Sequence, residues 1–81
     1  MYYVYVLRSL KNGKRYVGST SKSVAIRLGQ HRSGSTQWTR QNGPFEIVHV
    51  EEFSDKISAR QRERSLKTGN GRAFLDKIIP R

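Results

Sequence analysis

The sequence predicts an α+β fold, in which a three-stranded antiparallel sheet is flanked by three helices. An Asn-Gly pair between two aromatic runs near the N-terminus is the strongest short-range signal for a β-hairpin. A later apolar run that follows a proline indicates a third strand. Three further segments place apolar residues at helical spacing behind capping residues. Eighty-one residues leave room for one small core, so we expect a single domain over residues 1–81.

The first strand is expected over residues 2–10. Its two alternating faces are both apolar or aromatic, with Tyr3 and Tyr5 on one face and Val4 and Val6 on the other. A strand of this kind is covered on both sides. We therefore expect it to be the central strand of the sheet.

The second strand, residues 14–19, should return antiparallel to the first. A two-residue turn at Asn12-Gly13 would place Tyr5 and Tyr16 on one face but roughly 13 Å apart along the strands. A longer loop that starts near Ser9 would put Tyr5 opposite Gly18 and bring the two rings together. We favour the longer loop.

A helix over residues 22–32 follows, with N-cap candidates in the Ser19-Thr20-Ser21 run and an end at Ser33-Gly34. Val24 and Leu28 form its inward stripe. Arg27 and His31 lie one turn apart at the edge of this stripe, where about 5 to 6 Å separates Cβ atoms, so both can address one anion. Taken singly, Arg27 would be read as a solvated base and His31 as a histidine that caps the helix end.

Residues 33–44 read as a polar loop that contains one large aromatic residue and one arginine. Trp38 could stack on a base while Arg40 clamps a phosphate, which is the pattern of strand-binding proteins. Trp38 could equally fold back as a lid on the small core. The sequence leaves both alternatives open.

The third strand is expected over residues 45–53, directly after Pro44. Its charged residues should lie at exposed or edge positions. Glu51 and Glu52 point to opposite faces because they are neighbours in a strand, so they cannot chelate one ion together. We interpret them as solvated charges.

Ser54-Asp55 should cap a helix over residues 56–68, which ends at Gly69. Glu63 lies on the same face as Ala59 and Leu66, so its carboxylate should be partly buried and should need a cation. One alternative is a metal ion; the other is an ion pair with Lys67 or with Arg60, worth about 0.3 to 0.5 kcal/mol.

A last helix is expected over residues 72–79. Four apolar side chains should face inward from it: Phe74, Leu75, Ile78 and Ile79.

Charge points to a polyanionic partner. The chain carries a formal charge of +10 and has a pI of about 10.7, a balance typical of nucleic-acid-binding proteins. Residues 1–45 contain eight basic residues and no Asp or Glu, so any catalytic carboxylate must come from the second half. The residues expected to bind nucleic acid are Lys14, Arg15, Lys22, Arg32, Trp38, Arg40 and Lys67.

The absence of cysteine excludes a disulfide scaffold and a thiolate zinc site, and it fits a reducing compartment. The apolar run at the N-terminus is too short for a signal peptide, and no run approaches the roughly 18 residues of a membrane span. We expect a cytoplasmic protein without a membrane partner.

Several of these residues also resemble a known family. Tyr3-Val4-Tyr5, then Tyr16-Val17-Gly18 after ten residues, followed by Arg27, His31 and the helical Glu63, resemble the GIY-YIG endonuclease domain over nearly the whole chain. The chain departs from the pattern at Tyr3, which stands in place of the first glycine.

The resemblance implies a metal-dependent endonuclease that hydrolyses DNA phosphodiester bonds. It implies that Glu63 holds one Mg²⁺ or Mn²⁺ ion, because the sequence offers no cluster of acids for two metals. Tyr16 would act as general base or orient the attacking water. Tyr5 and His31 would hydrogen-bond the reacting groups, and Arg27 would grip the phosphate oxygens in a fork.

Two other classes stay open on the sequence. One is a non-catalytic nucleic-acid-binding module, which would not need Glu63 beside an apolar stripe. The other is an RNA-associated structural protein, which would prefer folded or duplex RNA. If the chain is a nuclease, we expect a protein partner to supply specificity for structured or damaged DNA.

Overall fold

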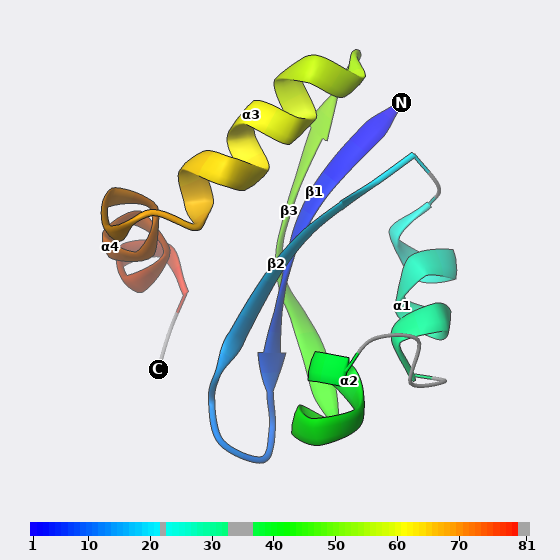
Figure 1. The fold of residues 1–81 in the computed structure, drawn as a ribbon, viewed down its shortest axis with the longest axis vertical. Coiled ribbons are helices and arrows are strands. Elements are labelled where there is room, and N and C mark those ends of the chain that lie inside the picture. Colours follow the sequence, from blue (N-terminus) through cyan, green and yellow to red (C-terminus); the bar gives the residue numbers. More distant parts are fainter. Residues whose placement is uncertain (22, 33–36, 80–81) are drawn as a thin grey trace.

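The computed structural model describes residues 1–21, 23–32 and 37–79, and for Trp38 and Thr39 it describes the backbone alone. In that part of the chain, β1 (Tyr2–Ser9), β2 (Arg15–Thr20) and β3 (Phe45–Phe53) form one antiparallel sheet in the order β2-β1-β3. The first strand is central, as its two apolar faces predict. Figure 1 shows the three strands side by side with helices on both faces.

The register of the hairpin confirms the longer loop. Tyr5 pairs with Gly18 and Leu7 with Tyr16. Ser9 closes the loop, because its N–H donates to Lys14 O at 2.8 Å and its carbonyl accepts from Gly13 N–H at 2.9 Å. Gly13, with φ of 76°, has the only positive φ among the described residues, so the two-residue turn with two such angles is not formed.

Two small cores lie on the two faces of the sheet. α1 (Val24–Arg32) covers one face, where Val24 and Leu28 pack against Tyr5, Leu7 and Phe45. The Oγ of Ser23 accepts from Ile26 N–H at 3.3 Å, so the structure places the N-terminal hydrogen bond of this helix at Ser23 rather than in the Ser19–Ser21 run.

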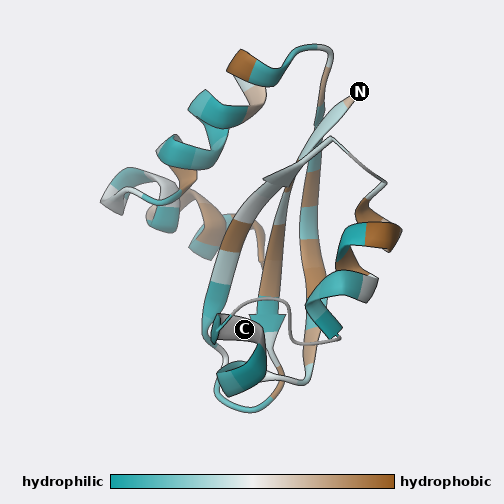
Figure 2. Ribbon diagram, turned by 45° about the vertical axis from the view of Figure 1, so that its right-hand side comes forward, coloured by the Kyte–Doolittle hydropathy of each residue, from teal (hydrophilic) through white to brown (hydrophobic). Residues whose placement is uncertain are grey.

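α3 (Lys56–Leu66) and α4 (Gly69–Ile78) cover the other face. The core beneath them contains Val4, Val6 and Val17 from the sheet together with Ala59, Leu66, Leu75 and Ile79. Asp55 caps α3 as predicted, since its side chain accepts from Ser58 N–H. Most of the α3 surface is hydrophilic (Figure 2), which leaves its polar residues available to a ligand.

A β-bulge lets β3 contribute to both cores. Val6 pairs with His49 whereas Leu7 pairs with Ile47, so one extra residue of β3 lies at this step. The extra residue changes which face the following side chains occupy. Ile47 and Phe45 thereby join the core under α1, and Val48 packs against the core under α3.

The prediction of three helices was wrong, because the described residues form four. The additional helix, α2 (Gln37–Asn42), lies inside the segment interpreted as a polar loop. It has no apolar stripe that periodicity could detect. Asn42 is buried, and its carbonyl accepts from the Oγ of Ser9 at 2.5 Å, so polar contacts connect this helix to the hairpin.

The last helix begins three residues earlier than predicted. Thr68 caps this helix, because its Oγ1 accepts from Gly71 N–H at 3.2 Å. The run Gly69-Asn70-Gly71, which was expected to precede the helix, therefore forms its first turn. Leu75 and Ile79 are buried, as predicted. Phe74 and Ile78 are 37% and 41% exposed, so the prediction that they face inward was wrong.

Glu51 is not the solvated charge that the sequence suggested. Its carboxylate accepts from Arg62 of α3 at 2.7 and 3.0 Å and contacts His49 Nε2 at 2.7 Å. The hydrogen bonds from Arg62 lower the pKa of Glu51, with a smaller contribution from His49, although burial acts in the opposite direction. The ion pair connects the edge strand to α3. Glu52 is exposed, as expected.

No helix in the described ranges 1–21, 23–32 and 37–79 is both long enough and apolar enough to cross a membrane.

Candidate active site

A polar cluster lies under α1, where the first strand meets that helix. The Oη of Tyr5 is 2.7 Å from Nε2 of His31 and accepts from Nε of Arg27 at 3.3 Å. Tyr5 is 2% exposed and His31 is 1% exposed. Arg27 is also held by Gln30, which accepts from its Nη1 at 2.8 Å. The predicted convergence of Tyr5, Arg27 and His31 is therefore present in the structure.

Tyr16 completes the aromatic side of this cluster. Its ring centroid is 5.3 Å from that of His31, and Tyr5 lies 5.6 Å from His31, both edge to face. The two tyrosines come together over Gly18. A Cβ at position 18 would lie 2.5 Å from Tyr5 Oη and 3.1 Å from a ring carbon of Tyr16, so this approach needs glycine.

The two buried groups favour their neutral forms. Burial raises the pKa of Tyr5, although the Arg27 contact acts in the opposite direction. Burial, followed by the charge of Arg27, lowers the pKa of His31. Nδ1 of His31 has no hydrogen-bond partner among the described residues. Near neutral pH the Tyr5–His31 pair is therefore uncharged beside the Arg27 cation.

Glu63 approaches from the other face of the sheet. Its Oε1 accepts from Ser19 Oγ at 2.5 Å, and its Oε2 accepts from Lys67 Nζ at 2.8 Å, with the side chain 22% exposed. Burial would raise the pKa of Glu63, but the hydrogen bonds from Lys67 and Ser19 lower it overall. The ion pair with Lys67, one of the two alternatives in the sequence, is thus formed.

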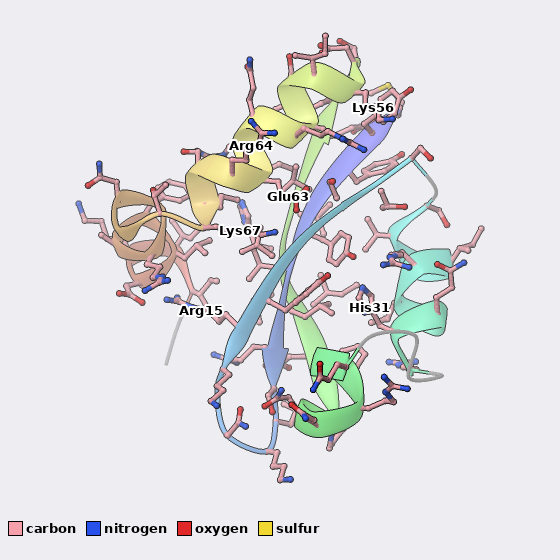
Figure 3. All side chains as sticks on the ribbon, in the orientation of Figure 1. Arg15, His31, Lys56, Glu63, Arg64 and Lys67 are labelled. Atoms are coloured by element: carbon pink, nitrogen blue, oxygen red, sulfur yellow. The ribbon has the colours of Figure 1, made fainter. Side chains whose placement is uncertain are left out.

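Strand alternation explains how the two halves meet. Gly18 belongs to the α1 face of β2, and Ser19, the next residue, belongs to the α3 face. Figure 3 shows His31 and Glu63 on opposite sides of β2, on α1 and α3 respectively. The charge of Glu63 contributes to the raised pKa of Tyr5, although less than burial does, so the two halves are in electrostatic reach.

The donor set fits a hard divalent cation. The described residues contain no group of three His, Cys, Asp or Glu side chains that could hold a metal. Mg²⁺ needs no such cage, because it commonly takes one or two carboxylates and keeps several waters. A carboxylate offers about four lone-pair sites, so Glu63 can accept from Ser19 and Lys67 and still coordinate an ion.

The basic residues divide into two groups. Lys14, Arg15 and Lys67 line one open hollow beside Tyr16, with a volume of about 860 Å³, although Arg15 also pairs with Asp76 at 2.7 Å. Arg32 and Arg40 are exposed on α1 and α2, and neither lines this hollow. Lys22 and the Trp38 side chain lie outside the described part of the structure.

Two site residues were missed in the sequence. Ser19 was considered as a helix cap, and the structure places its hydroxyl on Glu63 instead. The signal was its position directly after Gly18, since alternation sends it to the face that the third helix must cover. Gly18 was noted as a register partner and as part of the Tyr16-Val17-Gly18 motif, but it was given no role in the site, although it is the residue that admits both tyrosine rings.

Comparison with known proteins places this geometry in context. The sequence model of a family described as "GIY-YIG catalytic domain" matches residues 1–75. A UPF0213 protein of Natronomonas pharaonis is 40% identical over 79 residues, which cover 96% of this chain and 89% of that protein. A UPF0213 protein of Staphylococcus haemolyticus is 34% identical over 81 residues, which cover 99% and 96% of the two chains.

A solved structure is also similar. The solution NMR structure of a UPF0213 protein from Bacillus halodurans superposes with a TM-score of 0.58 at 33% sequence identity. The match covers 96% of this chain and 85% of that chain. The three-stranded antiparallel sheet and its helices thus have a counterpart in an experimental structure.

Proposed function

Because this chain belongs to the GIY-YIG family, we propose that it is a metal-dependent endonuclease that hydrolyses phosphodiester bonds in DNA. One observation carries the proposal. The ionised carboxylate of Glu63 lies on one face of the sheet at β2. The cluster of Tyr5, His31 and Arg27 lies on the other face, within electrostatic reach of that carboxylate. Phosphodiester hydrolysis needs these elements: a site for a cation, groups for the water and a grip on the phosphate.

Glu63 would hold a single Mg²⁺ or Mn²⁺ ion. Such an ion would draw charge off the pentacoordinate phosphate and the leaving oxygen. Ser19 donates to Oε1 and fixes the carboxylate in the seam between β2 and α3. Lys67 neutralises Oε2 when no ion is bound, so the free site is not left as an uncompensated half-buried charge.

The two tyrosines differ in environment, and we assign them different roles. Tyr5 is buried with a raised pKa, so it keeps its proton and positions groups through hydrogen bonds with His31 and Arg27. Tyr16 is half-buried at the edge of the same cluster, where water can reach it. We therefore assign Tyr16 the role of accepting a proton from the attacking water or orienting that water.

Arg27 would bind the non-bridging phosphate oxygens. Its Nε–H on Tyr5 and its Nη1–H on Gln30 hold the guanidinium plane in place from two sides. A planar group held in this way presents its remaining donors without a further loss of side-chain freedom. His31 is neutral and buried, and its hydrogen bond with the Tyr5 hydroxyl holds that group in place, so His31 is a positioning residue in this scheme.

DNA is the proposed substrate, since a charge of +10 favours a polyanion and the described hollows near Glu63 are lined by cations. A protein partner that supplies specificity stays part of the proposal.

The direct test is nicking of supercoiled plasmid by the purified protein. We expect nicked and then linear products with Mg²⁺ or Mn²⁺ and none with a chelator. Cleavage that a chelator does not stop would contradict the metal requirement. Binding without cleavage in any metal would favour the nucleic-acid-binding module, and preferential binding of folded RNA over DNA in competition at fixed salt would favour the RNA-associated alternative.

A further inference from the structure

Three open hollows follow one another along the seam between α3 and β2. The first has a volume of about 390 Å³ and shares Ser19 and Arg60 with the second, of about 350 Å³, which contains Glu63. The second shares Lys67 with the third, of about 860 Å³. The shared residues make the three hollows neighbours, and we call this row of hollows the groove; the carboxylate of Glu63 lies in its middle hollow.

Each end of the groove carries two cations that form no ion pair within the described part of the chain. Lys56 and Arg60 line the first hollow, and Lys14 and Arg72 line the third. None of these four forms an ion pair with another residue of the described part of the chain. The middle hollow contains Glu63, which is paired with Lys67, and it is also lined by Arg60 and Arg64. The groove is thus positive at both ends and contains its acid at the centre.

The spacing along α3 matches a nucleic-acid backbone. Arg60 lies three residues before Glu63, and Lys56 lies seven residues before Glu63. These separations correspond to about 5 and 10 Å along the helix axis. A strand of duplex DNA advances about 3.4 Å per nucleotide along the duplex axis. Figure 3 shows Lys56, Glu63 and Lys67 along α3, with Arg15 of β2 beyond them. A strand whose reacting phosphate lies at Glu63 would therefore bring phosphates one to three nucleotides away to Arg60 and Lys56.

Arg27 connects this groove to the cluster under α1, because it lines the first hollow and also donates to Tyr5. A strand in the groove would therefore pass the guanidinium already assigned to the phosphate. β2 is an edge strand of the described sheet, and Ser19 and Thr20 of this strand line the first hollow.

We propose that this seam is the track of the cleaved strand. Lys56 and Arg60 bind its phosphates on one side of the scissile phosphate, and Lys14 and Arg72 bind them on the other. Lys56 and Arg72 have no role in the sequence analysis, where Arg60 is considered only as a possible ion-pair partner of Glu63. The inference rests on the proposed function for the nature of the polyanion, but it makes a claim about binding that does not require cleavage.

The first experiment measures binding with a chelator present, so that no cleavage occurs. The double variant Lys56→Gln/Arg60→Gln should bind a short fluorescent DNA duplex about tenfold or more weakly, and the slope of log K against log [salt] should become shallower by about two. A matched control removes two charges outside the groove, in Lys11→Gln/Lys77→Gln, and should change both quantities much less. Equal losses in the two double variants would overturn the proposed track, because the effect would then reflect net charge alone.

The second experiment tests the two sides of the track. A duplex that carries one uncharged backbone linkage should be cut poorly at bonds a few nucleotides to either side of it. Lys56→Gln/Arg60→Gln should remove this protection on one side, and Arg72→Gln should remove it on the other. Loss of protection on the same side for both variants would overturn the assignment of the two ends.

The two ideas can fail separately. If the protein binds DNA through the groove residues but never cuts it, the track stands and the nuclease proposal fails. If it cuts DNA but the groove variants behave like the Lys11/Lys77 control, the nuclease proposal stands and the track fails. Circular dichroism of each variant establishes that it is folded, because all four groove cations are exposed and their truncation removes no core contact.

Discussion

At the scale of single residues, the site separates two kinds of hydroxyl by burial. Tyr5 shares its hydroxyl with His31 and Arg27 in a nearly closed environment, whereas Tyr16 lies at the border of the same cluster. Burial raises the pKa of Tyr5, so a proton is harder to remove there. In this way Tyr5 can serve as a fixed hydrogen-bonding group, while Tyr16, its neighbour in the sheet, serves as the group that faces water.

Arg27 provides the first prediction at this scale. Arg27→Lys keeps the charge but loses the planar fork and the Nε–H that reaches Tyr5. We expect cleavage to fall about 100-fold, with little change in DNA affinity. Single-turnover cleavage and a binding titration in chelator measure the two quantities separately. Cleavage by Arg27→Lys at the parent rate would show that Arg27 does not bind the phosphate oxygens in the reaction.

His31 provides a prediction about pH. Its pKa is lowered by burial and by Arg27, so the unfolded chain binds its proton first as the pH falls below about 6.5. Neutral His31 therefore makes its whole contribution to the free energy of unfolding above about pH 6.5. This contribution decreases as the pH falls toward the lowered pKa that His31 has in the folded protein. Denaturant unfolding between pH 7 and about pH 5 should show this loss, and His31→Gln should flatten the curve. An equally steep curve for His31→Gln would contradict a neutral, buried His31.

At the scale of elements, the hairpin decides where the chemistry can occur. Its five-residue connection sets Tyr5 opposite Gly18, and the sequence predicts this register from the need to bring two tyrosines together. The boundaries of β3 were also predicted, because Pro44 and an apolar run mark them. α2 was not predicted, since five polar residues and a single Trp carry no apolar periodicity. The pairing of Glu51 with Arg62 was not predicted either, because it depends on two elements that no local pattern relates.

The site itself was predictable to the same degree as its elements. Tyr5, Arg27 and His31 converge as expected, and Glu63 is partly buried with a cation beside it. Ser19 was missed because its partner lies 44 residues away in the chain, and Lys56 and Arg60 were missed because exposed basic residues on a helix look like a solvated face.

Gly18 provides the prediction at the scale of elements. Gly18→Ala would force a Cβ to within 2.5 Å of Tyr5 Oη and 2.7 Å of its Cζ, so a buried ring must move. Overpacking of this kind costs about 1 to 3 kcal/mol, and we expect a lower melting temperature together with lost cleavage. Gly29→Ala in the middle of α1 is the matched control, because nothing lies within 4 Å of its added Cβ and alanine favours a helix by up to about 1 kcal/mol. A Gly18→Ala protein as stable and active as the parent would show that the two rings do not need this contact.

At the scale of the whole molecule, charge is distributed to leave one region positive. Four of the six acids form ion pairs with basic residues in the described structure, and Asp55 caps α3. Lys56 and Arg60 at one end of the groove, and Lys14 and Arg72 at the other, have no such partner there. A field of this kind attracts a polyanion toward the seam that contains Glu63.

The corresponding prediction concerns salt. DNA binding should weaken steeply with salt, with a slope of log K against log [salt] of several units, since each neutralised phosphate contributes about 0.9. Anisotropy titrations at a series of salt concentrations, in chelator, measure the slope. A flat response would contradict binding through phosphates at any surface of the protein.

The central claim is that Glu63 holds the metal ion, and Glu63→Gln tests it most directly. The amide keeps the shape and can still contact Ser19 and Lys67, but it removes the charge that the cation needs. We expect nicking of supercoiled plasmid in Mg²⁺ or Mn²⁺ to fall about 1000-fold or more, because charge stabilisation by a metal is worth several kcal/mol, while DNA binding in chelator is retained or rises. Glu52→Gln, which removes the same charge from an exposed position on β3, should nick at the parent rate. Equal nicking by Glu63→Gln and the parent, with only a few tenths of a kcal/mol lost in stability, would show that Glu63 is the ion-pair partner of Lys67 and nothing more.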